Sequence, residues 1–368
     1  MWNQTRVSEL LGIRYPIIQG PFGGGLSTIQ LTAVVSNAGG MGSFGAHHLS
    51  PAQIKETVAA IKALTVRPFA MNLWIPLAGE AELRLDPSEF AANVSRLKHY
   101  YDGLGLPEPE FRETFNQRFE DQIEAVLDAQ PPVLSFVFGI PSRDILRALR
   151  QRAIKTIGAA TTVDEARALE EAGVDLIVAS GSDAGGHRPS FLESAEKSLT
   201  GTLALIPQVV DAVDTPIVAA GGIGDGRGIV AVLVLGAEGA QLGTVFLATH
   251  ESGASEAHKA ALVSESARST ALTRVFSGRL ARGIRNRFIE EMSPHEGELP
   301  PYPIQNWFTQ SIRGAAAEAG RAEYLSLWAG QSALFGHRRP AVITFAALVK
   351  GTEQLLQSPT SPLANWAS

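Results

Sequence analysis

Eight short apolar runs, with segments of helical pattern between them, constrain the fold of this chain more than any other feature. The runs cover residues 15–20, 40–46, 68–75, 133–138, 154–159, 175–179, 217–220 and 240–244. Repeated alternation of strand and helix implies a parallel sheet. Eight such units within about 240 residues suit a closed barrel better than an open doubly wound sheet. The sequence therefore predicts an α/β fold, a (β/α)8 TIM barrel.

Capping signals support the helices between these runs. Ser50 followed by Pro51 is typical of a helix start, and Thr162 and Gly173 bracket another helix. The remaining helices are expected over residues 28–38, 116–129, 142–152, 200–213 and 226–235.

Two segments lie outside this repeat. Residues 77–115 are polar and contain Pro87, Pro107 and Pro109, so we expect a partly helical insertion after the third strand, either a lid or a packing arm. The chain beyond residue 250 has helical patterns over 256–265, 310–319, 324–332 and 341–357. We thus expect a barrel domain over residues 1–250 and a helical extension over residues 251–368 packed on it.

Composition excludes several classes of protein. The 368 residues carry a net charge of −6 without a basic stripe, so nucleic acid is not an expected partner. The chain has no cysteine, which excludes disulfides, thiolate nucleophiles and cysteine-based metal sites. No apolar run reaches the length of about 18 residues that a membrane span needs, and the first residues do not resemble a signal peptide. These features favour a cytoplasmic enzyme without a membrane partner.

A histidine follows the sixth apolar run, in the segment SGSDAGGHR of residues 180–188. Gly185 and Gly186 let the main chain approach a flat ligand closely because they have no Cβ atom. At the mouth of a barrel, a neutral His187 could take a proton from an acidic C–H group or hydrogen-bond a reacting oxygen. The alternative is a loop histidine that caps a carbonyl group.

Glycine-rich segments follow the seventh apolar run and end the eighth, over residues 219–228 and 239–244. The loops after strands seven and eight are the usual phosphate site of this barrel. Main-chain N–H groups of such loops, together with Thr244, predict a phosphate cradle. The alternative is that these glycines serve only tight turns.

Other candidate positions carry weaker signals. Asn72 lies within an apolar strand, where its amide either satisfies a neighbouring loop or binds the edge of a ligand ring. Lys155 opens the fifth strand and either reaches a ligand ring or remains solvated. The segment GMGSFG at residues 40–45 spells a dinucleotide motif, but it lies within a strand, so we reject that interpretation. No histidine has metal-ligand spacing, and no metal site is expected.

Seven segments together resemble the nitronate monooxygenase family, formerly called 2-nitropropane dioxygenases. They are PIIQGPFGGG (16–25), VSNAGGMG (35–42), PFAMNL (68–73), DAGGHR (183–188), AAGGIGDGRG (219–228), LGAEGAQLGT (235–244) and LWAGQ (327–331). The resemblance implies a barrel with non-covalently bound FMN. It also implies oxidation of alkyl nitronates by O₂ to a carbonyl compound and nitrite, without NAD(P)H.

The resemblance also implies roles for particular residues. His187 matches the catalytic histidine of the family. The expected FMN-binding residues are Pro21, Phe22, Gly23, Asn72, Lys155, Ser180, Gly185, Gly186, Gly221, Gly222, Gln241, Leu242, Gly243 and Thr244. Among them, Pro21 to Gly23 would pass under the flavin ring, and Asn72 and Lys155 would contact its polar edge.

Two positions depart from the family pattern. Phe22 and Gly23 stand where the family often has methionine and a small residue, and Ser180 replaces its usual glutamine. Both changes alter the expected pocket near the flavin. The sequence leaves two other functions open: an FMN-dependent reductase that uses NAD(P)H on an enoyl thioester or quinone, and a regulatory flavin-binding module. It also leaves open whether the protein forms a homodimer.

Overall fold

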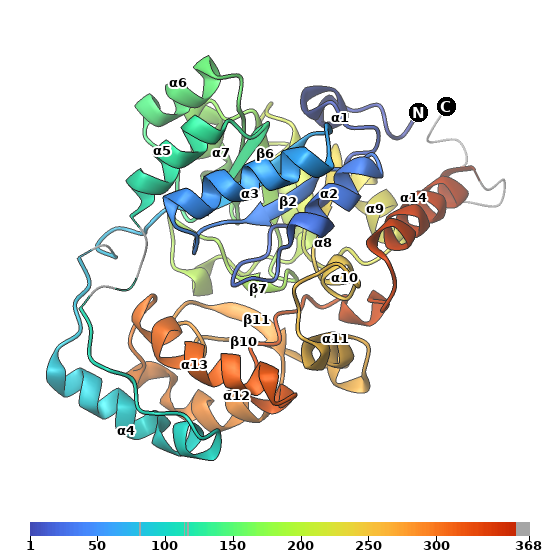
Figure 1. Ribbon diagram of the computed structural model, residues 1–368. Coiled ribbons are helices and arrows are strands. Elements are labelled where there is room, and N and C mark those ends of the chain that lie inside the picture. Colours follow the sequence, from blue (N-terminus) through green and yellow to red (C-terminus); the bar gives the residue numbers. More distant parts are fainter. Residues whose placement is uncertain (81, 114, 116–117, 358–368) are drawn as a thin grey trace.

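The computed structural model describes residues 1–80, 82–113, 115 and 118–357, and its central element is a parallel barrel (Figure 1). The strands pair in the order β1-β9-β8-β6-β5-β4-β3-β2. A parallel bridge between Ile18 and Met41 joins β1 to the segment before β2, which nearly closes the ring. The predicted barrel is confirmed. Its strands are β1 (Ile17–Gln19), β2 (Gly42–Gly45), β3 (Phe69–Trp74), β4 (Val133–Val137), β5 (Lys155–Ala160), β6 (Leu176–Ser180), β8 (Ile217–Ala220) and β9 (Gly239–Leu242).

Helices surround the barrel and begin where the sequence places capping residues. Ser50 and Gln53 form a capping box at the start of α3, with Pro51 in its first turn. The hydroxyl of Thr162 accepts from the N–H of Glu165 at the start of α7. Residues 116–117 of the helix predicted over 116–129 lie outside the described residues, and the helix described there is α5. The helices on the barrel are α2 (Ile29–Asn37), α3 (Pro51–Leu64), α5 (Phe119–Ala129), α6 (Arg143–Gln151), α7 (Val163–Ala172), α8 (Thr202–Val210), α9 (Gly226–Val234) and α14 (Ala341–Gln357).

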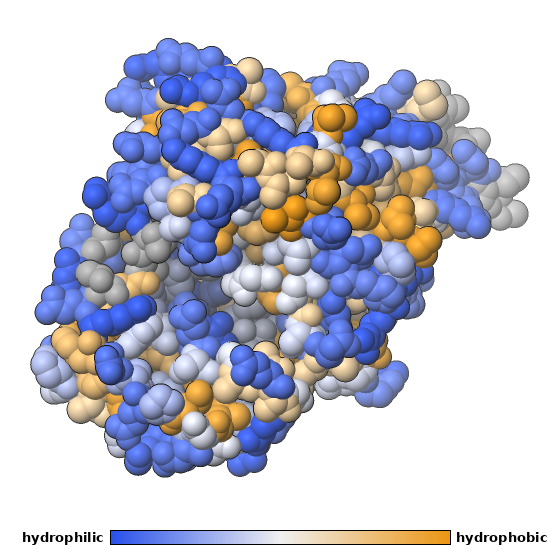
Figure 2. All heavy atoms as spheres, viewed as in Figure 1, coloured by the Kyte–Doolittle hydropathy of each residue, from blue (hydrophilic) through white to orange (hydrophobic). Residues whose placement is uncertain are grey.

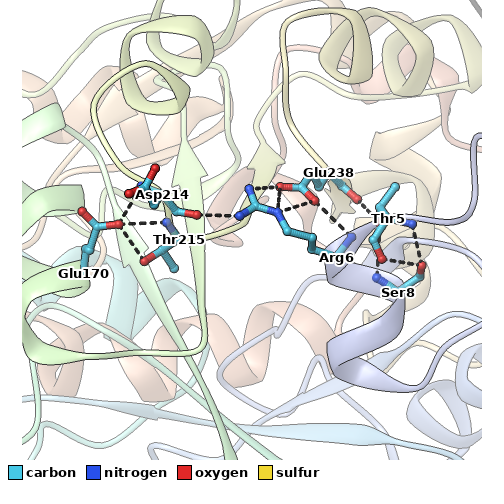
Figure 3. A network of polar contacts seen from close by, with 7 residues as sticks. All are labelled: Thr5, Arg6, Ser8, Glu170, Asp214, Thr215 and Glu238. Carbon is cyan, nitrogen blue, oxygen red and sulfur yellow. Dashed lines mark hydrogen bonds and ion pairs between the residues drawn. The ribbon is translucent and has the colours of Figure 1, made fainter.

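A short N-terminal helix, α1 (Arg6–Leu11), closes the amino end of the barrel. Its Val7 and Leu11 belong to the same buried cluster as Ile18 and Val218 from the strands. Polar contacts fasten α1 from outside (Figure 3): the Arg6 guanidinium pairs with Glu238, just before β9, and donates to the carbonyl oxygen of Asp214 at 2.7 Å. Helix α1 therefore covers the amino ends of the strands, opposite the end where the sites of this fold usually lie.

The insertion and the extension share a second apolar core below the barrel in Figure 1. Helix α4 (Pro87–Gly103) of the insertion packs on α13 (Ile304–Glu318), and the Tyr101 hydroxyl donates to the carbonyl oxygen of Phe308 at 2.7 Å. The insertion thus acts as a packing arm. The short helix α10 (Thr244–Leu247) follows β9 and leads into the extension. The other elements of the extension are α11 (Glu256–Leu262), α12 (Arg287–Met292) and short 3₁₀ turns at Glu265–Arg268, Ser293–Glu298, Ala322–Tyr324 and Ala333–Phe335.

The extension also contains strands that the helical pattern did not predict. Strands β10 (Thr270–Thr273) and β11 (Ala281–Ile284) form an antiparallel hairpin, and β11 pairs on its other side with β7 (Gly186–His187). The predicted helix over 324–332 is wrong. Leu325, Leu327 and Ala329 are buried at alternate positions, as in an extended segment, and the segment runs beside β11.

Helix α14 returns from the extension to the barrel and packs against α9 and α2. Figure 2 shows apolar side chains gathered near α14, where Val342 and Ile343 are about half exposed.

The predicted division into two domains at residue 250 stays a prediction, and residues 358–368 lie outside the described part of the chain. Within that part, no helix has the length and apolar character needed to cross a membrane.

Two neighbouring leucines test the role of α1. Leu11 is 4% exposed and Leu10 is 38% exposed. We expect Leu11→Ala to lower the free energy of unfolding by about 2–5 kcal/mol, because it leaves a cavity in the barrel interior. Leu10→Ala should change it by less than about 0.5 kcal/mol. Urea denaturation of both variants measures this, and equal effects would contradict the packing of α1 in the barrel.

Candidate active site

Most of the predicted cofactor residues lie at the carboxyl ends of the barrel strands. Asn72 lies near the end of β3, and Ser180 ends β6. The others lie either at the ends of strands β1, β6, β8 and β9 or in the loops that follow them. In a barrel of this kind, these ends meet on one face. The structure therefore brings together Pro21, Phe22, Gly23, Asn72, Ser180, Gly185, Gly186, Gly221, Gly222, Gln241, Leu242, Gly243 and Thr244 on one face.

Lys155 is the exception, and its assignment needs correction. It is the first residue of β5, so it lies at the opposite, amino end of the barrel. Its Nζ pairs with Oδ1 of Asp175 at 3.2 Å, at the same end. A strand of six residues spans nearly the whole barrel wall, so Lys155 cannot reach the polar residues at the other end.

The loops after β6 and β8 approach each other so closely that glycines are required. Gly221 and Gly222 have φ angles of +108° and +67°, which side chains rarely tolerate. A Cβ atom on Gly221 would lie 3.1 Å from the N atom of Ala184, and one on Gly222 would lie 3.1 Å from Cβ of Asp183. These glycines let two loops meet at the mouth of the barrel.

The loop after β9 joins the same group. The N–H of Gly330 donates to Oγ1 of Thr244 at 2.9 Å, and a Cβ atom on Gly330 would lie 3.1 Å from the N atom of Gly185. Among the described residues, none accepts a hydrogen bond from the main-chain N–H groups of Gly222 and Gly243. Such free N–H groups on glycine loops suit an anionic ligand such as a phosphate.

The loop after β1 is held in a fixed shape beside this group. The Ser27 hydroxyl accepts from the N–H groups of Phe22 at 2.9 Å and Gly45 at 3.2 Å. A Cβ atom on Gly23 would lie 2.3 Å from Cε1 of His47, so His47 requires glycine at this position. A Cβ atom on Gly243 would lie 3.6 Å from the Phe22 ring, which places the loops after β1 and β9 side by side.

Asn72 is a buried amide in the wall of the barrel. It is 2% exposed, and its Nδ2 donates to Oγ of Ser135 at 2.9 Å. One amide hydrogen is used in this bond, and the group retains capacity for a further polar contact. Asn72 therefore suits the polar edge of a bound ring.

His187 is held by a small antiparallel sheet as well as by the barrel. It pairs with Ala281 through β7 and β11, and its Nε2 lies 2.8 Å from Oγ of Ser277. Its ring contacts Trp74 and Trp328, with ring centroids 4.9 and 5.3 Å away. Backbone pairing, a hydroxyl and two indole rings thus fix the direction of the imidazole.

The neighbouring Arg188 secures the same loop. Its buried guanidinium donates to the carbonyl oxygens of Ser180, Thr161 and Ser198. Ser180 and Thr161 lie at the carboxyl ends of β6 and β5. Arg188 therefore binds the histidine loop to the barrel and has a structural role.

The surroundings of His187 keep its imidazole neutral. Burial of the ring, followed by the positive charges of Arg279 and Arg313, lowers the pKa of His187 to about 3. Burial of its ring, followed by the neighbouring groups His48, His187 and Arg279, holds the pKa of His47 well below its usual range. A neutral imidazole at pH 7 can accept a proton or donate a hydrogen bond.

Several residues beside the site belong to no motif of the sequence. Trp74 stacks on His47 with centroids 3.8 Å apart, and Arg279 pairs with Glu80 of the insertion. Tyr302 covers Arg279 from the extension. Their spacing along the chain carries no signal, because they meet only when the insertion, the hairpin and the barrel come together.

Comparisons with known proteins agree with this architecture. The family model described as nitronate monooxygenase matches residues 4–350. A probable nitronate monooxygenase from Staphylococcus aureus is 44% identical over 358 residues, which covers 97% of this chain and 99% of the relative.

Two solved structures are similar over nearly their whole length. Nitroalkane oxidase from Streptomyces ansochromogenes superposes with a TM-score of 0.85 and 36% identity, covering 95% of this chain and 98% of that one. FabK from Thermotoga maritima superposes with a TM-score of 0.74 and 27% identity, covering 96% and 97%. The full-length family match and the barrel face just described lead to one conclusion: this chain is an enzyme that belongs to the nitronate monooxygenase family.

Proposed function

We propose that this protein oxidises alkyl nitronates with O₂ to a carbonyl compound and nitrite, with FMN as its cofactor. The observation that carries the proposal is a neutral His187 beside glycine loops with free N–H groups, on the open face of the barrel. Family membership and the likeness to a nitroalkane oxidase support the same reaction class.

The residues that would hold FMN follow from the same face. We assign its phosphate to the N–H groups of Gly222 and Gly243 and to Thr244, and the polar edge of the ring to Asn72. The loop from Pro21 to Gly23 would contact the ring face. We assign the connecting part of the cofactor to Ser180, Gly185, Gly186, Gly221, Gln241 and Leu242. When bound, FMN supplies the electron transfer between an electron-rich nitronate and O₂.

His187 would act on the substrate in one of two ways. It would accept the α-proton of a neutral nitroalkane, or it would hydrogen-bond the oxygens of a nitronate that is already ionised. The Ser277 hydroxyl has one hydrogen, which goes either to Nε2 of His187 or to the carbonyl oxygen of Arg279 at 3.2 Å. In the second arrangement Nε2 carries the proton and Nδ1 is the free base.

Aromatic side chains would shield the reacting atoms from water. Trp74 contacts Phe138, Tyr302 and His187 with ring centroids 4.9, 5.5 and 4.9 Å away. Trp328 lies on another side of His187. A water-poor site strengthens electrostatic contacts with the substrate and protects reactive intermediates.

The reaction class can be tested by mixing the purified protein, without air, with ethyl nitronate and separately with NADPH or NADH. We expect rapid loss of the flavin absorbance with the nitronate and none with the pyridine nucleotides. Reduction by a pyridine nucleotide, with no response to nitronate, would instead favour the FMN-dependent reductase that the sequence left open. A protein that takes up no FMN would overturn the cofactor.

The proton-transfer role of His187 predicts a difference between two substrates. We expect His187→Asn to lower kcat/KM for nitroethane by about 100-fold or more, because asparagine cannot accept the proton. The same variant should affect ethyl nitronate less, since this substrate has already lost that proton. His295→Asn, at an exposed position in the 3₁₀ turn Ser293–Glu298 of the extension, is the matched control. Equal losses for both substrates would remove the base role from His187.

The lowered pKa of His187 can be measured directly. In ¹⁵N NMR we expect its imidazole to stay neutral at pH 5, because its pKa lies near 3 rather than 6.5. The unfolded chain binds this proton below about pH 6.5 and the folded chain does not, so acid should progressively destabilise the fold. The His187→Asn spectrum assigns the signal, and the ¹⁵N shifts also identify the tautomer. A midpoint near 6.5 would contradict the burial of the ring.

A further inference from the structure

Arg279 has an unusual environment in the loop between β10 and β11. The residue is only 8% exposed. Its guanidinium carbon lies 3.9 Å from the ring centre of Phe138 and 4.3 Å from that of Tyr302, with Trp74 at 5.4 Å. Three aromatic rings from the barrel and the extension therefore surround one buried cation.

Only part of this guanidinium is paired. Nη2 binds both carboxylate oxygens of Glu80, from the insertion, at 2.7 and 2.5 Å. Among the described residues, Nη1 is buried and has no hydrogen-bond partner. A buried donor without a partner carries a desolvation penalty, so its position points to a ligand or solvent that completes the bond.

A second buried atom without a partner belongs to another residue that lines the same cavity. Nδ1 of His47 is buried and also lacks a partner within the described residues. Both side chains line one cavity of about 30 Å³, together with Trp74, Tyr302 and Glu80. This volume holds roughly two water-sized groups. Gln122, which also lines the cavity, already donates through Nε2 to the carbonyl oxygens of His47 and Leu49.

The charges around the cavity favour an anion. Arg279, Arg313 and Glu80 all act electrostatically on Tyr302, so two positive groups and one negative group lie near this ring. The guanidinium of Arg313 is partly buried and donates to Oδ1 of Asn306 and the carbonyl oxygen of Thr309. A small anion would balance the remaining positive charge, whereas a neutral water would leave it uncompensated.

We propose that this cavity is an oxyanion subsite in which Nη1 of Arg279 and Nδ1 of His47 bind the two oxygens of a planar NO₂ group. The inference rests on the proposed function, since the group would belong to the nitronate substrate. Trp74 lines this cavity and its ring also contacts that of His187. A substrate bound through its NO₂ group in the subsite would therefore have its α-carbon near the imidazole. Arg279 thus determines specificity for substrates that carry a small planar oxyanion.

Inorganic nitrite is the probe, titrated into the FMN-loaded protein by calorimetry without nitronate present. Two variants share the loss of the Glu80 charge and differ only at Arg279. Glu80→Gln should bind nitrite about fivefold more tightly than the parent, because a competing carboxylate is gone. The double variant Glu80→Gln, Arg279→Gln should bind it at least about tenfold more weakly than Glu80→Gln. The double variant leaves no unpaired buried charge, which favours its folding.

The outcomes separate the subsite from the proposed reaction. Equal nitrite affinity in the two variants, or no binding to Glu80→Gln, would overturn the subsite even if the parent oxidises nitronates. The expected order of affinities in a protein that does not oxidise nitronates would uphold the oxyanion site and reject the proposed reaction. With both intact, the Arg279 change should raise KM for ethyl nitronate more than it lowers kcat, because it removes substrate binding.

Discussion

The pairing of β7 with β11 is the constraint on which the rest of the site depends. β7 is only two residues long, yet it attaches the loop after a barrel strand to a hairpin of the extension. The loop of the same hairpin places Ser277 beside the imidazole of His187. It also places Arg279 among the rings of Trp74, Phe138 and Tyr302. This short backbone pairing of two residue pairs therefore fixes the histidine, its hydroxyl partner and a buried cation relative to one another.

Burial decides the chemistry that these groups can perform. The rings of Trp74 and Trp328 and the cations Arg279 and Arg313 surround His187, so its charged form is disfavoured. A histidine on an open loop would titrate near neutral pH, so most of it would already carry a proton under acidic conditions and could not accept another. The extension thus desolvates a residue of the candidate site that the barrel supplies.

The departure from the family pattern at Phe22 and Gly23 has a structural explanation. His47 lies so close to Gly23 that any Cβ atom there would collide with its ring, and His47 in turn stacks on Trp74. Phe22 packs against both the barrel core and the core of the extension. Gly23 therefore leaves room for the ring of His47, and Phe22 packs where the two cores meet.

The sequence by itself determined the barrel, because alternating apolar runs and capped helices are local patterns that the parallel sheet preserves. It also located His187 and the glycine loops, since each follows a strand directly and strand ends converge in this fold. It misplaced Lys155, because a position at a strand start lies at the wrong end of the barrel. Only the tertiary structure decided that Arg279 contacts Glu80 and Tyr302, since these residues are far apart in the chain. Their contacts arise from packing between the insertion, the hairpin and the barrel, which local periodicity cannot encode.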